Sequence, residues 1–104
     1  MGRTVARKVT VHGQVQGVFF RASTRRVAQE QGVTGWVANR ADGAVVAWLE
    51  GAPDAVETVE AWMVTGGPPA AEVDDVESGS VPPEGHERFE VRDEPRSGDE
   101  EPGG

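Results

Sequence analysis

Hydrophobic and polar positions along the first third of the chain follow two different periods. From Val5 to His12, valines recur at odd positions while Lys8, Thr10 and His12 face the other way, which predicts a strand. From residue 21 to residue 31 the spacing becomes helical, and Gly32 follows where a C-terminal cap belongs. The predicted buried face of this helix comprises Phe20, Thr24, Val27, Ala28 and Gln31.

The rest of the chain predicts four more strands or helices and a short closing strand. Strands over 36–40 and 44–50 flank Ala41-Asp42-Gly43, a sequence typical of a hairpin turn. Pro53 begins a second helix, which Gly66-Gly67-Pro68-Pro69 ends. Its predicted buried stripe comprises Val56, Val59 and Met63. A strand follows over 72–78, with an expected bulge at Asp74-Asp75, and residues 89–91 close the series.

This order of elements indicates an α+β fold. Two helices of this length can cover one face of a sheet, so we expect a ferredoxin-like split βαβ sandwich with an antiparallel sheet. We assign residues 1–92 to this domain. Residues 93–104 carry five acids and no large apolar side chain, which predicts an acidic flexible tail.

Composition removes several classes of site. The 104 residues include no cysteine and two histidines, which excludes disulfides, thiolate chemistry and a histidine-rich metal centre. We therefore expect no metal and no cofactor. No apolar run reaches the ~18 residues of a membrane span, and the N-terminus lacks a secretory signal, so we expect a cytoplasmic protein without a membrane partner.

Charge is distributed unevenly along the chain. The formal net charge is −8, yet residues 1–40 contain seven basic side chains and a single acid, Glu30. The overall sign argues against nucleic acid as a partner. The basic first segment is nevertheless suited to attracting a small anion.

The segment from Gly13 to Arg21 holds the candidate chemistry. It joins a strand to a helix whose first backbone amides have no partner within the helix, and glycines allow such a loop to curl around one anion. It lacks the Gly-Lys-Ser/Thr of a nucleotide P-loop and the GxGxxG of a dinucleotide fold.

Arg21 departs from the usual preference for acids at the start of a helix. An arginine beside converging amides suits a phosphoryl group, because its planar fork bonds two oxygens at once. An ordinary glycine turn followed by a surface arginine remains an equal alternative on spacing alone. Asn39, just ahead of an Asp-Gly turn, is likewise typical of turn chemistry.

Two long motifs resemble those of the acylphosphatases, small hydrolases of carboxyl phosphates. Residues 13–21 read GQVQGVFFR and residues 35–45 read GWVANRADGAV. Two shorter matches, LEG at 49–51 and GPPAAEV at 67–73, extend the resemblance over nearly all of residues 3–92. The fold that the resemblance implies is the ferredoxin-like sandwich reached above.

The resemblance also implies a site and a reaction. Arg21 matches the family's phosphate-binding arginine, and Asn39 matches the asparagine that orients the attacking water. The backbone amides of the loop would hold the phosphoryl group, and they belong to Val15, Gln16, Gly17, Val18, Phe19 and Phe20. The implied reaction is metal-independent hydrolysis of an acyl phosphate to carboxylate and inorganic phosphate. We expect a monomer that also binds inorganic phosphate or sulfate.

Two other functions compete with hydrolysis. The same loop could bind phosphate or carbamoyl phosphate without turnover, as in similar domains at the front of larger hydrogenase-maturation carbamoyltransferases. A ferredoxin-like RNA binder would need an aromatic platform motif, which is missing, and the charge opposes it. His12 could be a proton shuttle, although a structural histidine is the simpler interpretation. The sequence identifies neither an acyl pocket nor the physiological acyl phosphate.

Overall fold

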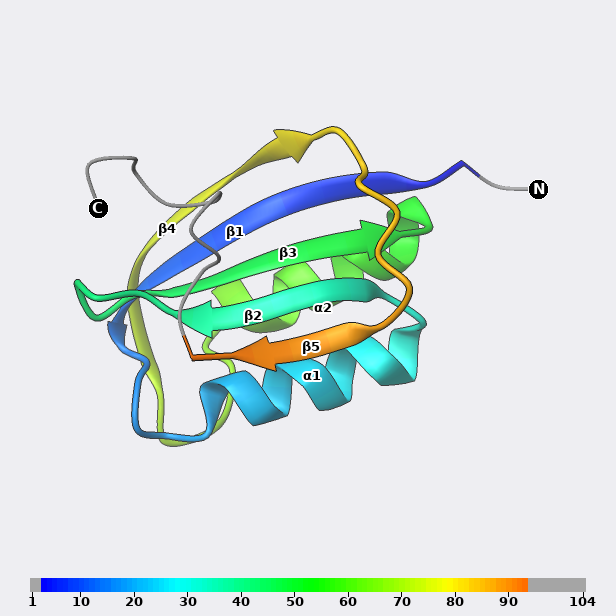
Figure 1. Cartoon of the computed structure of the whole chain (residues 1–104). Helices are drawn as coiled ribbons and strands as arrows, with labels where there is room; N and C mark the ends of the chain where they lie inside the picture. The colour runs from blue at the N-terminus through cyan, green and yellow to red at the C-terminus, as the bar shows by residue number, and fades with distance from the viewer. Residues whose placement is uncertain (1–2, 94–104) are drawn as a thin grey trace.

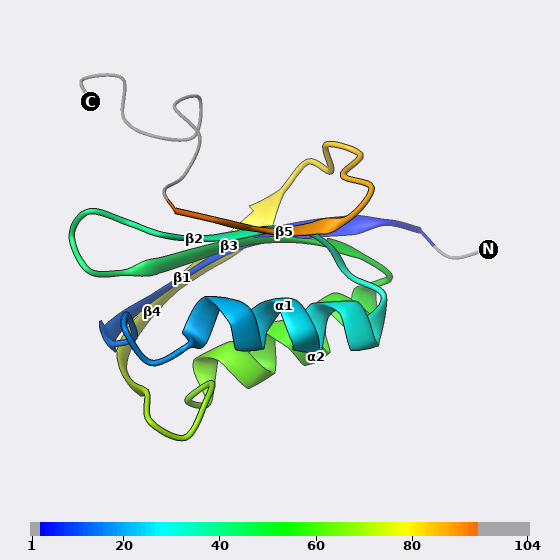
Figure 2. The ribbon, with the colours of Figure 1, turned by 60° about the horizontal axis from the view of Figure 1, so that its bottom comes forward.

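The computed structural model describes residues 3–93, which form one sheet with both helices packed on the same face (Figures 1 and 2). The elements, in chain order, are β1 (Val5–Gln14), α1 (Phe20–Gln31), β2 (Thr34–Asn39), β3 (Val45–Gly51), α2 (Pro53–Val64), β4 (Glu72–Val81) and β5 (Phe89–Arg92). Apart from Asp93, the acidic tail predicted over 93–104 lies outside the described residues. The order of the elements and the packing of both helices on one face of the sheet confirm the predicted ferredoxin-like arrangement.

The sheet has the strand order β4-β1-β3-β2-β5 and is mixed. β1 pairs antiparallel with β3 and β4, and β2 pairs antiparallel with β3, but β5 runs parallel to β2. The expectation of a wholly antiparallel sheet was wrong at this edge. β4 runs opposite to β2, so a chain that crosses from the end of β4 to the far edge must begin β5 in the direction of β2.

Strand and helix boundaries differ from the predicted ones by a few residues. β1 continues to Gln14, and α1 begins one residue early at Phe20. The bulge predicted in β4 is present, because His12 pairs with Asp75 while Gly13 pairs with Val73. A Cβ on Gly13 would lie 2.3 Å from the carbonyl oxygen of Glu72, so only glycine allows the strands to approach here.

The main core lies between the sheet and the two helices. Phe20, Thr24, Val27 and Ala28 of α1 are buried as predicted, whereas Gln31 is exposed because it lies in the last turn. Val56, Val59 and Met63 form the buried stripe of α2, as expected. The ring of Phe20 packs against Trp62 with centroids 5.6 Å apart, which anchors the first turn of α1 in the core.

A second, smaller core lies on the face of the sheet opposite the helices. Trp36 and Trp48 are buried there with ring centroids 6.5 Å apart. The Glu50 carboxylate beside them accepts hydrogen bonds from the Trp48 indole and from the backbone N–H groups of Glu84, Gly85 and His86. The segment between β4 and β5 is thus held on this face by one buried carboxylate.

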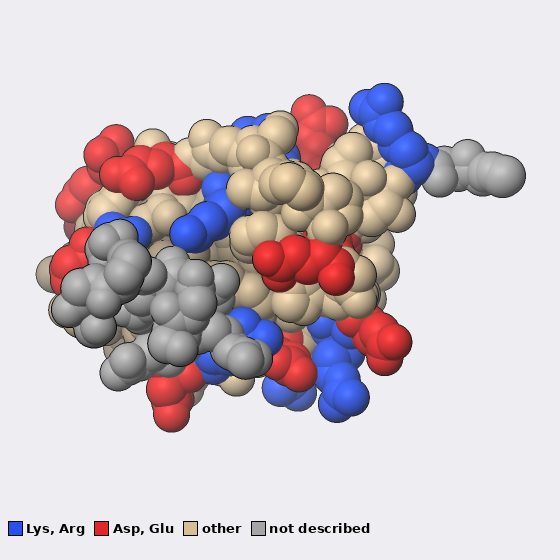
Figure 3. Space-filling model, turned by 45° about the horizontal axis from the view of Figure 1, so that its top comes forward, with Lys and Arg blue, Asp and Glu red and all other residues tan. Residues whose placement is uncertain are grey.

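Figure 3 views the molecule from this side and shows basic, acidic and uncharged side chains interspersed over the described part of the surface. No continuous basic surface is visible on that part. Trp36 and Trp48, the tryptophans of this second core, are only 1% and 8% exposed. Both rings are therefore packed inside the second core and expose little surface on the described part of this face.

Burial raises the pKa of Glu50, but its hydrogen bonds outweigh that effect and hold the pKa below the ordinary value of 4.5. A carboxyl group with a lowered pKa in the folded state stabilises the fold fully above its unfolded pKa. That contribution is lost as the pH falls through the folded value.

We predict that Glu50→Gln lowers the free energy of unfolding by about 2–4 kcal/mol at pH 7, because an amide NH2 would face N–H donors. The variant should also lose less stability than the wild type between pH 5 and pH 3. Urea unfolding at several pH values measures both effects. Glu57→Gln, at an exposed position of α2, is the matched control. Equal acid sensitivity in wild type and Glu50→Gln would contradict the assigned role.

Candidate active site

A five-residue loop, 15–19, connects the end of β1 to the start of α1. Gly17 has φ +77°, in the left-handed region, and a Cβ there would contact nothing within 4 Å. Phe19, the N-cap residue, also has a left-handed backbone, with φ 63° and ψ 26°, and no side chain caps the helix. For a residue other than glycine, this conformation costs of the order of 1 kcal/mol. The curl of the loop therefore comes from two left-handed residues.

The backbone amides of this loop face no acceptor in the part of the chain that the structure describes. Among residues 3–93, the amides from Val15 to Phe20 donate no hydrogen bond to a backbone or side-chain group. The first turn of α1 contains no acid that could interact with the helix dipole. Unpaired amides next to a helix N-terminus bind anions well, so the loop presents a site for a negatively charged group.

Arg21, in the first turn of α1, is held by the end of β5. Its Nη1 donates a hydrogen bond of 2.7 Å to the carbonyl oxygen of Arg92 and lies 3.4 Å from Oδ1 of Asp93. The Arg21 side chain is 29% exposed and that of Asp93 is fully exposed, so the ion pair is weak. Among the described residues, no group accepts a hydrogen bond from Nε or Nη2 of Arg21.

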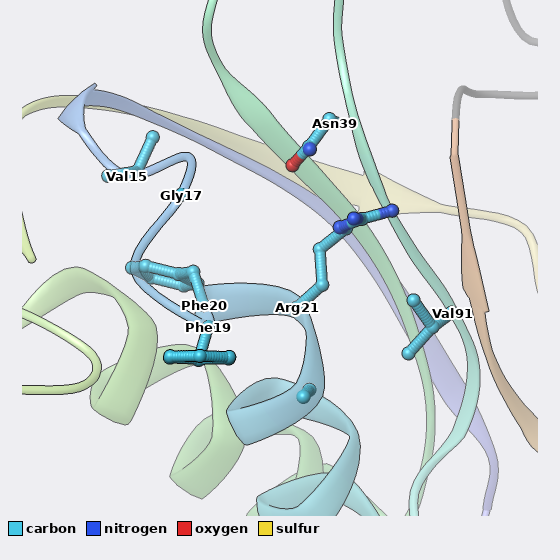
Figure 4. Close-up of a pocket in the computed structure, with 8 residues that line it drawn as sticks. Val15, Gly17, Phe19, Phe20, Arg21, Asn39 and Val91 are labelled. Carbon is cyan, nitrogen blue, oxygen red and sulfur yellow. The ribbon is translucent and has the colours of Figure 1, made fainter.

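Asn39 is the last residue of β2, and the register of the sheet carries it toward the loop. Val45 of β3 pairs with Val11 of β1 on one side and with Asn39 on the other. The ends of β1 and β2 therefore lie at the same end of the sheet, so the loop that follows β1 is close to Asn39. Figure 4 shows the side chains of Asn39 and Arg21 directed into the same space from β2 and α1.

Arg21 and Asn39 line one pocket of about 300 Å³ together with the loop. The lining residues are Val15, Gly17, Phe19, Phe20, Arg21, Ala22, Asn39 and Val91. Arg21 and Asn39 are the two with polar side chains. The structure thus brings together, around one hollow, the side chains and much of the loop that the sequence predicted.

The side chain of Gln16 ties the loop to the β2–β3 hairpin. Its Nε2 donates hydrogen bonds of 2.9 Å to the carbonyl oxygens of both Arg40 and Ala44. Asp42, in the turn between them, accepts from the Arg40 side chain and the Ala44 amide, and these bonds lower its pKa to about 2. These hydrogen bonds therefore fix the loop to the hairpin that carries Asn39.

His12 and the acidic side chains of β4 lie outside the pocket. His12 Nε2 is 3.5 Å from Glu77 Oε2 on β4, and His12 is not among the residues that line the hollow. Asp74, Asp75 and Glu77 are exposed along β4. Within residues 3–93, no three His, Cys, Asp or Glu side chains are grouped so that they could hold a metal ion.

No helix in the described part is both long and apolar enough to cross a membrane.

Sequence reasoning missed four contributions to this pocket. The clamp by the Gln16 side chain and the contact from the Arg92 carbonyl join segments 24 or more residues apart, and no local pattern signals them. The side chains of Phe19 and Val91 on the rim were also missed, since sequence reasoning assigned Phe19 only its backbone amide. The Phe19-Phe20 pair was an available signal, since two adjacent aromatic side chains next to a helix start raise the question of which one packs in the core.

Comparisons with known proteins agree on one family. The family model described as acylphosphatase matches residues 7–91. An acylphosphatase of Gloeobacter violaceus is 50% identical over 91 residues, which cover 88% of this chain and 97% of the relative. The solved acylphosphatase of Coxiella burnetii is 39% identical with a TM-score of 0.81, over 86% of this chain and 93% of that one.

A full-length HypF structure, in a phosphate- and nucleotide-bound form, also resembles the chain. Its TM-score is 0.84 at 22% identity, and the match covers 90% of this chain but 12% of HypF. This likeness shows a shared fold alone. The family model matches most of the chain, and relatives about 50% identical to it match over nearly their whole length. The chain therefore belongs to the acylphosphatase family, whose members are hydrolases.

Proposed function

We propose that the pocket between the loop, Arg21 and Asn39 hydrolyses the carboxyl-phosphate bond of acyl phosphates without a metal ion. The products are a carboxylate and inorganic phosphate. One observation carries this proposal: the unpaired loop amides, a guanidinium and a neutral amide side chain surround one small hollow. Inorganic phosphate and sulfate should bind there as product-like ligands.

The phosphoryl group is held by the loop amides and by one edge of the Arg21 guanidinium. Because Nη1 is engaged by the Arg92 carbonyl, the Nε–Nη2 edge is left to form two parallel hydrogen bonds with phosphoryl oxygens. The amides supply further donors without any rearrangement. Such prepositioned donors stabilise the charge that develops on the phosphoryl oxygens as the bond breaks.

Asn39 orients the attacking water. A neutral amide can accept a hydrogen bond from water through its oxygen while its nitrogen donates elsewhere. The water oxygen forms a bond to phosphorus as the bond from phosphorus to the acyl oxygen breaks, and a phosphoryl oxygen takes the proton from water. The carboxylate leaving group has a conjugate acid with a pKa near ~4, so it needs no general acid.

This chemistry explains why the pocket needs no histidine base. His12, the nearest candidate along β1, contacts Glu77 rather than the hollow. Independence from metal and a cytoplasmic location both stay predictions. Turnover in excess chelator tests the first directly.

Arg21→Ala should lower kcat/KM for acetyl phosphate about 10²- to 10⁴-fold. Two charge-assisted hydrogen bonds at ~1.5–3 kcal/mol each would be lost. Arg21→Lys should also be poor, because an ammonium lacks the planar fork. Hydrolysis is measured with excess chelator, and Arg25→Ala, an exposed arginine of the same helix outside the pocket, is the control.

Near-normal turnover by Arg21→Ala would refute the proposed site. Saturable binding of phosphate by the wild type, with no turnover of acetyl or benzoyl phosphate, would instead support the alternative that the loop binds phosphate without hydrolysis. Turnover that the chelator abolishes would contradict metal independence while leaving the site in place.

Asn39→Ala should reduce kcat by about 10²-fold or more while inorganic phosphate remains a competitive inhibitor with little change in Ki. The expected split follows because the substitution removes a donor and acceptor for water but leaves Arg21 and the loop amides intact. Steady-state kinetics with phosphate as inhibitor measure both quantities. If phosphate binding were lost to the same extent as kcat, Asn39 would be a structural residue of the hairpin instead.

A further inference from the structure

Two apolar side chains on the rim of the pocket are unusually exposed. Phe19 is 82% exposed and Val91 is 36% exposed, and they are the two exposed large hydrophobic residues within the described part of the chain. Both line the pocket that contains Arg21 and Asn39. Scattered surface hydrophobics need no explanation, but two that meet at a single functional hollow do.

Core packing does not account for Phe19. Its neighbour Phe20 is 2% exposed and fills the core against Trp62, while a Cβ on Gly67 would come within 2.5 Å of the Phe20 ring. Phe20 therefore occupies the core position at the start of α1. Phe19 lies on the rim with a left-handed backbone that a residue other than glycine adopts only at a cost.

The place of these residues relative to the phosphoryl site indicates what they contact. The Phe19 amide belongs to the loop that holds the phosphoryl group, and Val91 immediately precedes Arg92, whose carbonyl fixes Arg21. Because Phe19 and Val91 line the same hollow as Arg21 and Asn39, a group attached to a phosphoryl held there would lie close to this rim. Apart from Arg21 and Asn39, every residue that lines the pocket is apolar or glycine, so no further charge is available to receive a charged acyl group.

We propose that Phe19 and Val91 are specificity-determining residues that contact the acyl group and favour acyl phosphates whose acyl part is uncharged and apolar, above all aromatic. This inference rests on the proposed function. An aromatic acyl group would pack against the Phe19 ring in an offset or edge-to-face arrangement, whereas an acetyl group is too small to cover it.

The test compares kcat/KM for benzoyl phosphate with kcat/KM for acetyl phosphate in wild type and variants. Both substrates carry the same phosphoryl group, so a disturbance of the loop lowers both values and cancels in their ratio. Dividing each variant's ratio by that of the wild type also removes the difference in intrinsic reactivity. Phe19→Ala should lower the benzoyl-to-acetyl ratio about tenfold.

The other variants separate apolar contact from loop structure. Phe19→Leu should keep the ratio within about threefold of the wild type, since it restores an apolar side chain of similar reach. Val91→Thr, which is isosteric but polar, should lower the ratio about two- to threefold. Val76→Thr on β4, a partly buried position outside the pocket, is the matched control and should leave the ratio unchanged.

An unchanged ratio in Phe19→Ala would overturn the inference, even if both kcat/KM values fell. Concentration-dependent self-association that Phe19→Ala abolishes, together with an unchanged ratio, would assign the rim to a second copy of the chain instead. A wild type that hydrolyses neither substrate would refute the proposed function itself, which is distinct from either result.

Discussion

The proposed active site depends on a row of backbone amides that find no acceptor within residues 3–93. Two left-handed residues, Gly17 and Phe19, curl the loop between β1 and α1, and no side chain caps the helix that follows. Buried or crowded amides without partners are costly, so a loop of this kind persists when the surrounding structure holds it and an anion satisfies it. In the proposed mechanism, fixed main-chain donors of this kind reduce the chemistry required of side chains to one guanidinium and one neutral amide.

The sheet and the core supply the support that this loop needs. Phe20 anchors the start of α1 in the core, while Gln16 binds the two carbonyls that flank the β2–β3 turn. The last described residues of the sheet edge contribute as well, because the carbonyl of Arg92 orients Arg21. Since β5 is parallel to β2, its end lies at the same end of the sheet as Asn39. The mixed topology thus serves the site as well as the fold.

The fold was predictable from sequence where the signal is local, and less so where distant segments meet. The helical period around Val27 and the glycine cap at Gly32 identified α1, and the slipped period at Asp74-Asp75 identified the bulge. The parallel pairing of β5 was missed because nothing in residues 89–92 records which edge they join. The resemblance to the acylphosphatases singled out Arg21 and Asn39, whereas spacing alone left ordinary turns as alternatives. The roles of the Gln16 side chain and of exposed Phe19 follow only from tertiary structure.

The most direct test of the central claim is a titration of the chain with inorganic phosphate in excess chelator, followed by the backbone amide resonances of the loop. We expect saturable shifts concentrated at the amides from Val15 to Phe20, with the largest at Gly17 and Phe19, and much weaker binding when Arg21 is replaced by alanine. Phosphate that binds with shifts elsewhere, while these amides stay unchanged, would contradict the account.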